Sequence, residues 1–365
     1  MGQSTRRVLI VNECGAFWPS GYVRALQYKS LFDACPEWDA EFTTRRSEPL
    51  ARLGADRRIA VRAALKPFRK QLSGYVSDWE KRQEDRIVRS ALAFDIVIIN
   101  KSPGIELYKR LRDLNGPRII MDINDAVWLP AFGWNDLTET LSIVDAVICE
   151  NEYIAGYARR HNQDVWVIPD APQIEVFDRF RSSIRRDTQS IVVGWIGARQ
   201  NVGPLIHLAE PLEKLFRRYE SLRLRVVGAG PSDINQLRSL RHSCRPSFDQ
   251  IEMVSEVLRF DIGLFPLLRD EDGLARGTLK AMVYMSGEAA VVAEYFGENP
   301  NLINNNINGL LASSPEEWYD CLERLVIDSP RRNIISRNGL ETIRDKFTAE
   351  RIFEKMIEVY DATLD

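Results

Sequence analysis

Residues 191–197 read IVVGWIG, a short and continuously apolar run that is rich in β-branched side chains. A run of this kind, without polar alternation, is typical of a strand covered on both faces, as in a parallel sheet. It follows APQIEVFDRFRSSIRRDTQS at 171–190, a polar and arginine-rich stretch with little periodicity. A new series of buried strands therefore begins at Ile191, and this predicts a second domain.

Similar runs occur on both sides of this one. They are VLIV (8–11), DIVIIN (95–100), RIIMDI (118–123), DAVIC (145–149), VWVIP (165–169), LRVVGAG (224–230) and DIGLFPL (261–267). Segments with helical periodicity separate them, and this alternation predicts an α/β fold with doubly wound parallel sheets. For 365 residues we expect two Rossmann-like domains that face one another across a cleft, where ligands bind at the carboxyl ends of strands. The expected boundaries are 1–172, completed by a C-terminal helix at 347–365, then a linker at 173–190 and a second domain at 191–346.

The composition excludes several classes of protein. The chain has 49 basic and 52 acidic residues and a net charge of −3, so we expect no nucleic-acid partner. No apolar run approaches the roughly 18 residues of a membrane span, and the first residues lack the pattern of a signal peptide. The five cysteines are scattered and show no CxxC spacing, and the three histidines show no spacing typical of metal ligands. We expect a reduced, cytoplasmic protein with no metal site.

One segment departs from this charge balance. Between Arg45 and Lys70 there are nine basic residues and two acidic ones, with apolar side chains interleaved. The segment is either a solvated helical face or a surface that attracts an anionic membrane or an anionic acceptor. The second reading predicts peripheral association with the inner face of the membrane.

The first strand leads into PSGYVR at 19–24, where a helix begins. Free backbone amides at a helix start attract anions, Gly21 allows a phosphate or sugar to approach closely, and Arg24 lies one turn further on. The alternative is a tight turn with no ligand. In the second domain, IVVGWIGARQNVG places Arg199 on a glycine-containing loop at a strand end, where a guanidinium can bind phosphate oxygens in bidentate fashion. The alternative there is a surface arginine.

The stretch GLARGTLK at 273–280 combines a loop, a helix start and two cations. Amides of residues 277–279 can converge on an anion that Arg276 and Lys280 neutralise, although Lys280 would otherwise be a solvated lysine. The preceding Asp270, Glu271 and Asp272 satisfy a DxD pattern, but the nearby cations favour charge neutralisation without a metal. LRVVGAGPSD has Asp233 where a dinucleotide fingerprint needs its third glycine, so an oxidoreductase that uses NAD is disfavoured.

At these residues the chain resembles the retaining glycosyltransferases of the GT-B fold, family four, often labelled glycosyl transferases group 1. The similar landmarks, in order, are FDIVIINKS, RIIMDINDAVW, VDAVICENEYIAGYARR, VWVIPDAP, IVVGWIGA, LRVVGAG, FDIGLFPL, LKAMVYMSGEAAVVA, NNINGLLASSPEEW and IRDKFTAERIFEKMIEVY. The resemblance implies a nucleotide diphosphate sugar bound chiefly by the second domain, and a glycan or lipid-linked acceptor bound by the first. It implies no further cofactor.

The resemblance also assigns roles to residues of this chain. Arg199 and Lys280, with Arg276, would stabilise the leaving diphosphate. The residues expected to contact the donor are Gly21, Gly197, Gly277, Thr278, Leu279, Glu271, Asp272 and Phe248. The residues expected on the acceptor side are Arg24, Lys101, Asp122 and Asp125.

The chain departs from the family pattern at four positions. Ala275 and Val283 stand where members usually carry two glutamates, Glu288 stands where a glycine is expected, and Pro204 replaces a usual lysine. These departures place the chain in a divergent branch. They leave open a non-catalytic binding or scaffold protein that kept the fold and lost turnover.

Overall fold

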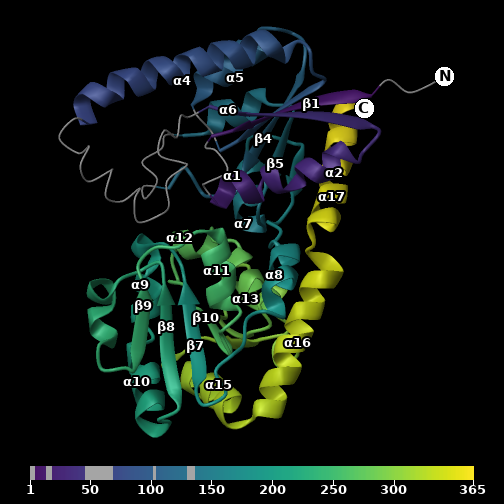
Figure 1. Cartoon of the computed structure of the whole chain (residues 1–365). Coiled ribbons are helices and arrows are strands. Elements are labelled where there is room, and N and C mark those ends of the chain that lie inside the picture. Colours follow the sequence, from purple (N-terminus) through teal and green to yellow (C-terminus); the bar gives the residue numbers. More distant parts are fainter. Residues whose placement is uncertain (1–4, 14–18, 46–68, 102–103, 130–135) are drawn as a thin grey trace. The chain divides into compact units, whose positions relative to one another are not determined.

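A computed structural model describes residues 5–13, 19–45, 69–101, 104–129 and 136–365 (Figure 1). The chain divides into two compact units, of which the first comprises Met1–Asp170 with Ala349–Asp365 and the second Ala171–Thr348. Each unit contains a six-stranded sheet whose paired strands are all parallel. The predicted α/β class with two doubly wound, Rossmann-like domains is confirmed.

The sheet of the first unit has the order β2-β1-β3-β4-β5-β6. Its strands are β1 (Arg6–Asn12), β2 (Trp38–Thr44), β3 (Ile96–Asn100), β4 (Arg118–Ile123), β5 (Ala146–Cys149) and β6 (Val165–Val167). The chain moves from β1 to β2 on one side and then crosses to β3 on the other. The carboxyl ends of β1 and β3 therefore flank the point at which the strand order reverses.

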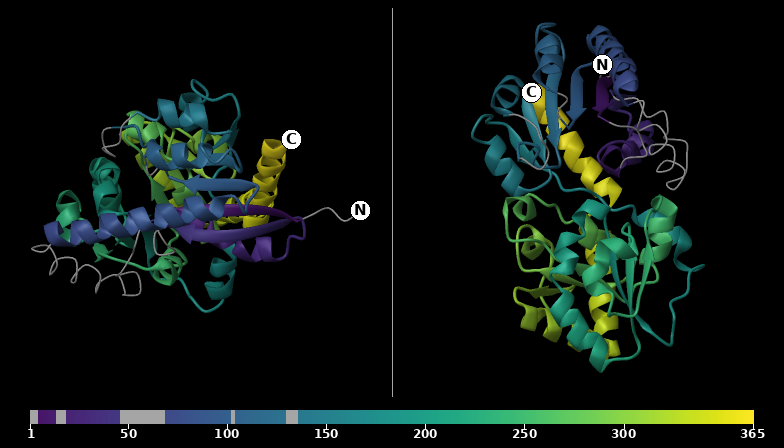
Figure 2. Two further views of the ribbon diagram at one scale, coloured as in Figure 1. Left: turned by 90° about the horizontal axis from the view of Figure 1, so that it is seen from above. Right: turned by 90° about the vertical axis from the view of Figure 1, so that its left-hand side faces the viewer.

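Helices cover the sheet of the first unit. Those within the described residues are α1 (Pro19–Val23), η1 (Leu26–Tyr28), α2 (Lys29–Asp33), α4 (Arg69–Ala91), α5 (Ile105–Arg112), α6 (Thr138–Ile143), α7 (Glu152–Ala158) and α17 (Ala349–Leu364). Helix α4, with 23 residues, is the long blue helix in Figure 2. Ile87 and Ala91 of α4 pack with Leu107 of α5 and Val97 of β3 in one buried cluster.

Helix α17 supplies aromatic side chains to the first unit, although it follows the second unit in the sequence. The ring of Phe353 lies 4.7 Å from that of Phe32, and the ring of Tyr360 lies 5.5 Å from that of Trp38 (centroid distances). The Trp38 indole N–H also donates to Asp361 at 3.1 Å. The first unit is thus built from both ends of the sequence.

The sheet of the second unit has the order β12-β11-β10-β7-β8-β9. Its strands are β7 (Ile191–Ile196), β8 (Leu222–Val227), β9 (His242–Arg245), β10 (Ile262–Phe265), β11 (Ala290–Glu294) and β12 (Leu310–Ala312). The helices are α8 (Ile174–Arg181), η4 (Arg199–Asn201), α9 (Gly203–Ile206), α10 (Ala209–Arg218), η5 (Pro231–Leu237), α11 (Gln250–Val257), α12 (Glu271–Leu274), α13 (Leu279–Ser286), α14 (Asn299–Leu302), α15 (Pro315–Ile327) and α16 (Ser329–Lys346).

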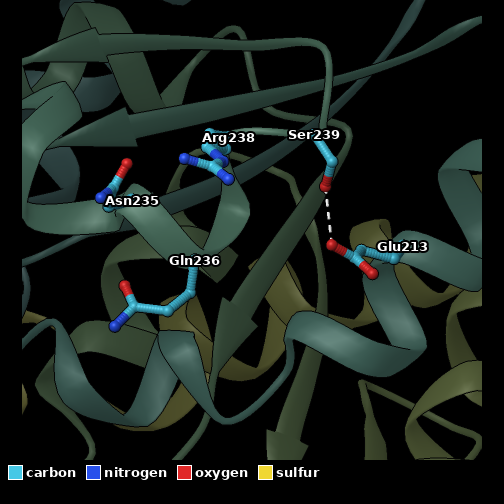
Figure 3. Close-up of a pocket in the computed structure, with 5 residues that line it drawn as sticks. All are labelled: Glu213, Asn235, Gln236, Arg238 and Ser239. Carbon is cyan, nitrogen blue, oxygen red and sulfur yellow. Dashed lines mark hydrogen bonds between the residues drawn. The ribbon is translucent and has the colours of Figure 1, made fainter.

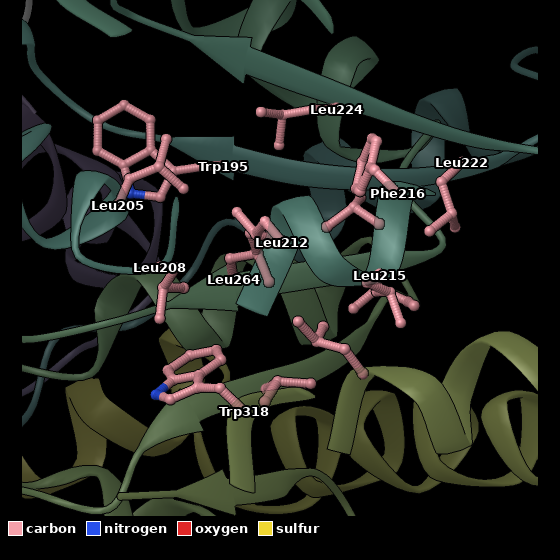
Figure 4. Packing of buried hydrophobic residues seen from close by; sticks show 14 of the residues in the cluster. Trp195, Leu205, Leu208, Leu212, Leu215, Phe216, Leu222, Leu224, Leu264 and Trp318 are labelled. Carbon is pink, nitrogen blue, oxygen red and sulfur yellow. The ribbon is translucent and has the colours of Figure 1, made fainter. Parts of the chain in front are cut away.

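The second sheet has a buried cluster on each face. Figure 4 shows one of them, in which Trp195 of β7 and Leu264 of β10 belong to the same cluster as Leu212 of α10 and Trp318 of α15. The other cluster combines alternate residues of the same strands with α8, α11, α13 and α16. Burial on both faces explains why the inner strands read as continuous apolar runs.

The segment 173–190, expected as a linker, contains helix α8, whose Phe177 is fully buried in the second unit. Its arginines bind the carboxyl end of α13. Arg181 donates to the carbonyl of Ser286 at 2.7 Å, and Arg186 donates to that of Glu288 at 2.6 Å. Two of the arginines in the segment that suggested a linker therefore bond to backbone carbonyls within the second unit.

None of the helices in the described part of the chain combines the length and apolar character that crossing a membrane requires. Residues 46–68, which form most of the basic segment that the sequence singles out, lie outside the described residues. Arg45, its first member, is buried and pairs with Glu13 at 2.6 Å and with Glu84 at 3.0 Å. Arg45 is therefore not part of a solvated basic face.

Candidate functional site

The topology of the second unit marks one place at the edge of its sheet. From β7 the chain proceeds to β8 and β9 on one side, and later fills the other side with β10, β11 and β12. Ligands of open α/β sheets bind at such a switch point, beside the carboxyl ends of the two strands that flank it. These ends are Ile196 of β7 and Phe265 of β10.

Lys280 lies at this switch point. Its ammonium is 4.9 Å from the ring centroid of Trp195 in β7 and 5.4 Å from that of Phe265 in β10. One turn further along α13, the Tyr284 hydroxyl accepts a hydrogen bond of 2.9 Å from the backbone N–H of Ile196. This bond fixes α13 to the end of β7 and thereby positions Lys280.

The charge of Lys280 is not compensated. Among the residues that the structure describes, its half-buried side chain forms no ion pair and no hydrogen bond. Burial, followed by repulsion from Arg276, lowers the pKa of Lys280 to about 7. An anion bound here would supply the missing counter-charge and raise this pKa again.

Glycines directly follow β7 and β8, and the first of them, Gly197, leaves space beside this lysine. A Cβ on Gly197 would come within 2.7 Å of the Trp195 ring and within 3.2 Å of the Lys280 ammonium. Gly228 has a positive φ of 95°, and a Cβ there would come within 1.9 Å of the carbonyl oxygen of Gly197 and 2.8 Å of the Phe248 ring. The loops after β7 and β8 therefore touch through bare backbone, with Phe248 beside them.

Helix α13 begins beside the lysine, as the sequence predicts. Thr278 is its first flanking residue and forms no side-chain cap, so the amides of the first turn remain open to an acceptor. Gly277, Thr278 and Leu279 thus lie at the helix start, adjacent to Lys280. Phosphate oxygens fit this combination of free amides and an uncompensated ammonium.

The other two predicted cations have partners within the protein. Arg276 pairs with Asp272 at 2.7 Å. Arg199 lies on η4 with an exposed side chain, and its Nε donates to Asp233 at 2.7 Å. Of the three cations assigned to the diphosphate, Lys280 is the one without an acidic partner among the described residues.

The DxD loop is also engaged internally. Asp270 caps helix α12 by accepting from the amide of Gly273 at 2.8 Å, and Asp272 holds Arg276. Glu271 is exposed. In the described part of the chain, no group of three or more His, Cys, Asp or Glu residues is arranged to hold a metal ion.

In the first unit, all four residues expected on the acceptor side form internal ion pairs. Arg24 is buried and donates to Asp122 at 2.6 Å, to Asp170 at 3.2 Å and to the carbonyl of Ile168 at 2.8 Å. Lys101 pairs with Asp125 at 2.5 Å. The guanidinium of Arg24 is thus used within the unit rather than offered to an anion.

Gly21 lies in α1, a helix of five residues. The loop before it, residues 14–18, lies outside the described residues. The phosphate contact expected of Gly21 therefore stays a prediction.

Sequence reasoning missed Glu150, which follows β5 directly. Its carboxyl is buried and has no hydrogen-bond partner among the described residues. Burial, followed by repulsion from Asp170, raises the pKa of Glu150 well above its ordinary value. An acidic residue immediately after an apolar strand run is the signal that could have found it.

The structure also contains a hollow of about 530 Å³ on the second unit, and Lys280 is not among the residues that line it (Figure 3). Glu213, Asn235, Gln236, Arg238 and Ser239 line it. It lies over α10 and η5 rather than at a strand end, and the Ser239 hydroxyl donates to Glu213 at 2.7 Å across it. We assign it no function.

Neither a protein-family model nor a curated protein sequence matches this chain. Solved structures do. A glycosyltransferase from Rickettsia africae ESF-5 is similar with a TM-score of 0.70 at 13% identity, covering 99% of both chains. Sucrose-phosphate synthase from Thermosynechococcus elongatus gives a TM-score of 0.64 at 13% identity over 98% of each chain. Anabaena HepE in complex with UDP and glucose gives a TM-score of 0.65 at 13% identity, and the match covers 98% of this chain and 100% of the HepE chain. This chain therefore has the GT-B fold that these proteins share.

Proposed function

We propose that this chain is a retaining glycosyltransferase that moves a sugar from a nucleotide diphosphate sugar to a hydroxyl group of a glycan or a lipid-linked acceptor. The observation that carries the proposal is the uncompensated Lys280 ammonium at the switch point of the second sheet, beside Gly197 and the start of α13. The likeness to structures that contain UDP and UDP-glucose supports a nucleotide sugar as the donor.

The chemistry rests on stabilisation of charge. As the bond between the sugar carbon and the diphosphate oxygen breaks, negative charge develops on the diphosphate, and Lys280 and the amides of the first turn of α13 stabilise it. The acceptor oxygen forms the new bond on the same face of the sugar. The departing phosphate oxygen takes the proton that the acceptor hydroxyl loses, so no separate base is needed.

We further propose that the reaction needs no metal ion. Asp270 and Asp272 are already used to cap α12 and to bind Arg276, and Lys280 stands where a cation would neutralise the diphosphate. The basic segment from Arg45 to Lys70 remains a sequence-based proposal for attachment to an anionic membrane surface. Cytoplasmic location is part of the same proposal.

The test is release of UDP from UDP-sugars by the purified protein, with and without candidate acceptors and with excess chelator. Replacing Lys280 by alanine should lower turnover by about 10²-fold or more, roughly 2.7 kcal/mol of transition-state stabilisation. Lys214 offers a matched control, because its ammonium also lies over an aromatic ring, 4.1 Å from the centroid of Tyr319, but on α10. Full activity of the Lys280→Ala protein, or activity that a chelator abolishes and magnesium restores, would contradict the mechanism.

A second candidate is a binding protein without turnover. It rests on Val283 and Ala275, apolar residues at the positions where the family usually has glutamates. Nucleotide sugars that raise the melting temperature without being consumed would favour this candidate.

A further inference from the structure

The first unit contains a cavity of about 340 Å³ that the proposed mechanism does not use. It opens where β1 and β2, neighbouring parallel strands, reach their carboxyl ends. Its lining residues are Asn12, Leu26, Phe42, Thr43, Thr44, Trp79, Gln83 and Arg86. The volume lies within the range of about 300–1,000 Å³ that is usual for small-molecule sites.

A buried polar group at this cavity has no partner. Asn12 ends β1 opposite Asn100 of β3, and its side-chain oxygen accepts from the Asn100 amide at 2.7 Å. Its own Nδ2 has no hydrogen-bond partner among the described residues, and neither has the Asn100 Oδ1. A buried polar group without a hydrogen-bond partner destabilises the protein, so this amide pair marks a place where a hydroxyl group of a ligand would be stabilised.

The remaining lining groups combine flat apolar surfaces with hydrogen-bonding groups. Trp79 and Phe42 contribute rings, while Thr43, Thr44 and Gln83 contribute hydroxyls and an amide. A sugar ring has matching chemistry, because its C–H face can pack on an aromatic ring while its hydroxyls bond to amides and hydroxyls at its edge.

One arginine at the cavity is in a position to bind an anionic sugar. Arg86 lines the cavity and forms no ion pair with any described residue. The nearby acidic residues Glu13, Glu80 and Glu84 are all bound to Arg45. Arg86 is therefore available for a carboxylate or a phosphate, which a guanidinium binds in bidentate fashion.

We propose that this cavity binds one sugar unit of the acceptor, a pyranose that carries a carboxylate or phosphate substituent. Its assignment to the acceptor rests on the proposed function, whereas binding of the sugar itself does not. The stacking surface is the Trp79 ring, the anion contact is Arg86, and Asn12 donates to a ring hydroxyl.

Binding can be followed at Trp79 by fluorine NMR of protein labelled with 5-fluorotryptophan, with the Trp79 signal assigned from the Trp79→Phe variant. The probes are glucuronic acid and glucose 6-phosphate, with glucose as the uncharged match. We expect both anionic sugars to shift the Trp79 signal, at a concentration about tenfold below that at which glucose does. No shift with any of the three sugars, or equal affinities for all of them, would overturn the proposal.

The two arginines of α4 give a matched pair of variants. Arg86→Ala should remove the preference for the anionic sugars, whereas Arg82→Ala should keep it, because exposed Arg82 bonds to the carbonyl of Asp78 on its own helix. Preference for one probe alone distinguishes a carboxylate from a phosphate as the substituent. Loss of the preference in both variants would contradict the role of Arg86.

A separate measurement distinguishes this inference from the proposed function. UDP should raise the melting temperature of wild-type and Trp79→Ala proteins equally, because Lys280 and Trp79 belong to different units. Failure of UDP, ADP and GDP alike to bind would contradict the proposed function, while the sugar titrations at Trp79 would still decide whether the cavity is a sugar site.

Discussion

Lys280 shows how a single residue connects sequence to chemistry. Its place at a helix start after a buried strand could be predicted from GLARGTLK. Its lack of a counter-charge could not, because that depends on Asp272 binding Arg276 and on Asp233 binding Arg199. Which cation stays unpaired is decided by side-chain contacts that leave no pattern in the sequence.

The pKa of about 7 predicts a pH dependence of diphosphate binding. Below pH 7, Lys280 of the free protein is already protonated, and this is the state that a bound diphosphate favours. As the pH rises above about 7 the free lysine loses this proton while the complex keeps it, so the affinity for UDP should fall, by at most about tenfold per pH unit.

Calorimetric titration of UDP between about pH 7.5 and 9 measures this dependence, together with proton uptake on binding. Lys280→Arg is the control, because arginine stays charged throughout this range. The affinity of this variant for UDP should therefore not change with pH. If the affinity of the wild-type protein for UDP is as independent of pH as that of the arginine variant, Lys280 does not contact the diphosphate.

We expect a substitution at Gly197 to affect UDP binding, as a substitution at Lys280 should. A methyl group at Gly197 would meet the fully buried Trp195 ring, which has no room to move, and would also crowd the Lys280 ammonium. We expect Gly197→Ala to destabilise the second unit by about 1–3 kcal/mol and to weaken UDP binding.

Gly203 supplies the comparison, because a Cβ there meets nothing within 4 Å and the residue begins helix α9. Gly203→Ala should change stability by less than about 1 kcal/mol. Denaturant unfolding of both variants with and without UDP makes the comparison, and equal behaviour would contradict the assigned role of Gly197.

At the scale of elements, the end of α13 explains one departure from the family pattern. Glu288 has a positive φ of 58°, its amide donates to the carbonyl of Met285, and the amide of Ala289 donates to that of Tyr284. This is a Schellman motif, in which glycine is preferred at the position that Glu288 occupies. Arg181 contacts the Glu288 carboxylate at 3.4 Å, and Arg186 binds its carbonyl.

Glu288→Gly should therefore raise the free energy of unfolding of the second unit by about 1 kcal/mol, since glycine adopts this conformation without strain. Glu288→Ala keeps the strain and removes the carboxylate, so it should be no more stable than wild type. Urea unfolding of the three proteins tests the argument, which fails if the glycine and alanine variants are equally stable.

The elements that sequence analysis found and missed differ in burial. Inner strands such as β3 and β7 lie between two covered faces and read as apolar runs. The edge strands β2 and β9 were missed because one side of each is open, which allows the charged residues Asp39 and Glu41 in β2 and Arg245 in β9. The cavity beside Trp79 was missed for another reason, since it joins residues from four elements that are distant in sequence.

At the scale of the whole molecule, the first unit depends on α17. Tyr360→Ala removes a fully buried ring that packs on Trp38, so it should destabilise the first unit by about 3–5 kcal/mol. Scanning calorimetry should then show two unfolding transitions, of which UDP raises only the one that belongs to the second unit.

Tyr360→Phe is the matched control for this change. The Tyr360 hydroxyl is buried without a hydrogen-bond partner among the described residues, so its removal should cost little. A single transition in Tyr360→Ala that UDP shifts as a whole would show that the two units unfold together.

The return of α17 to the first unit has a consequence for synthesis on the ribosome. Phe32 and Trp38 leave the exit tunnel long before Phe353 and Tyr360, which they contact in the folded protein. The intervening second unit takes roughly 10–35 s to translate at about 5–20 residues per second. The second unit can fold from a continuous stretch of nascent chain, whereas the first must wait with aromatic side chains uncovered. This interval is the one in which chaperones that recognise exposed aromatic segments would act on the nascent chain.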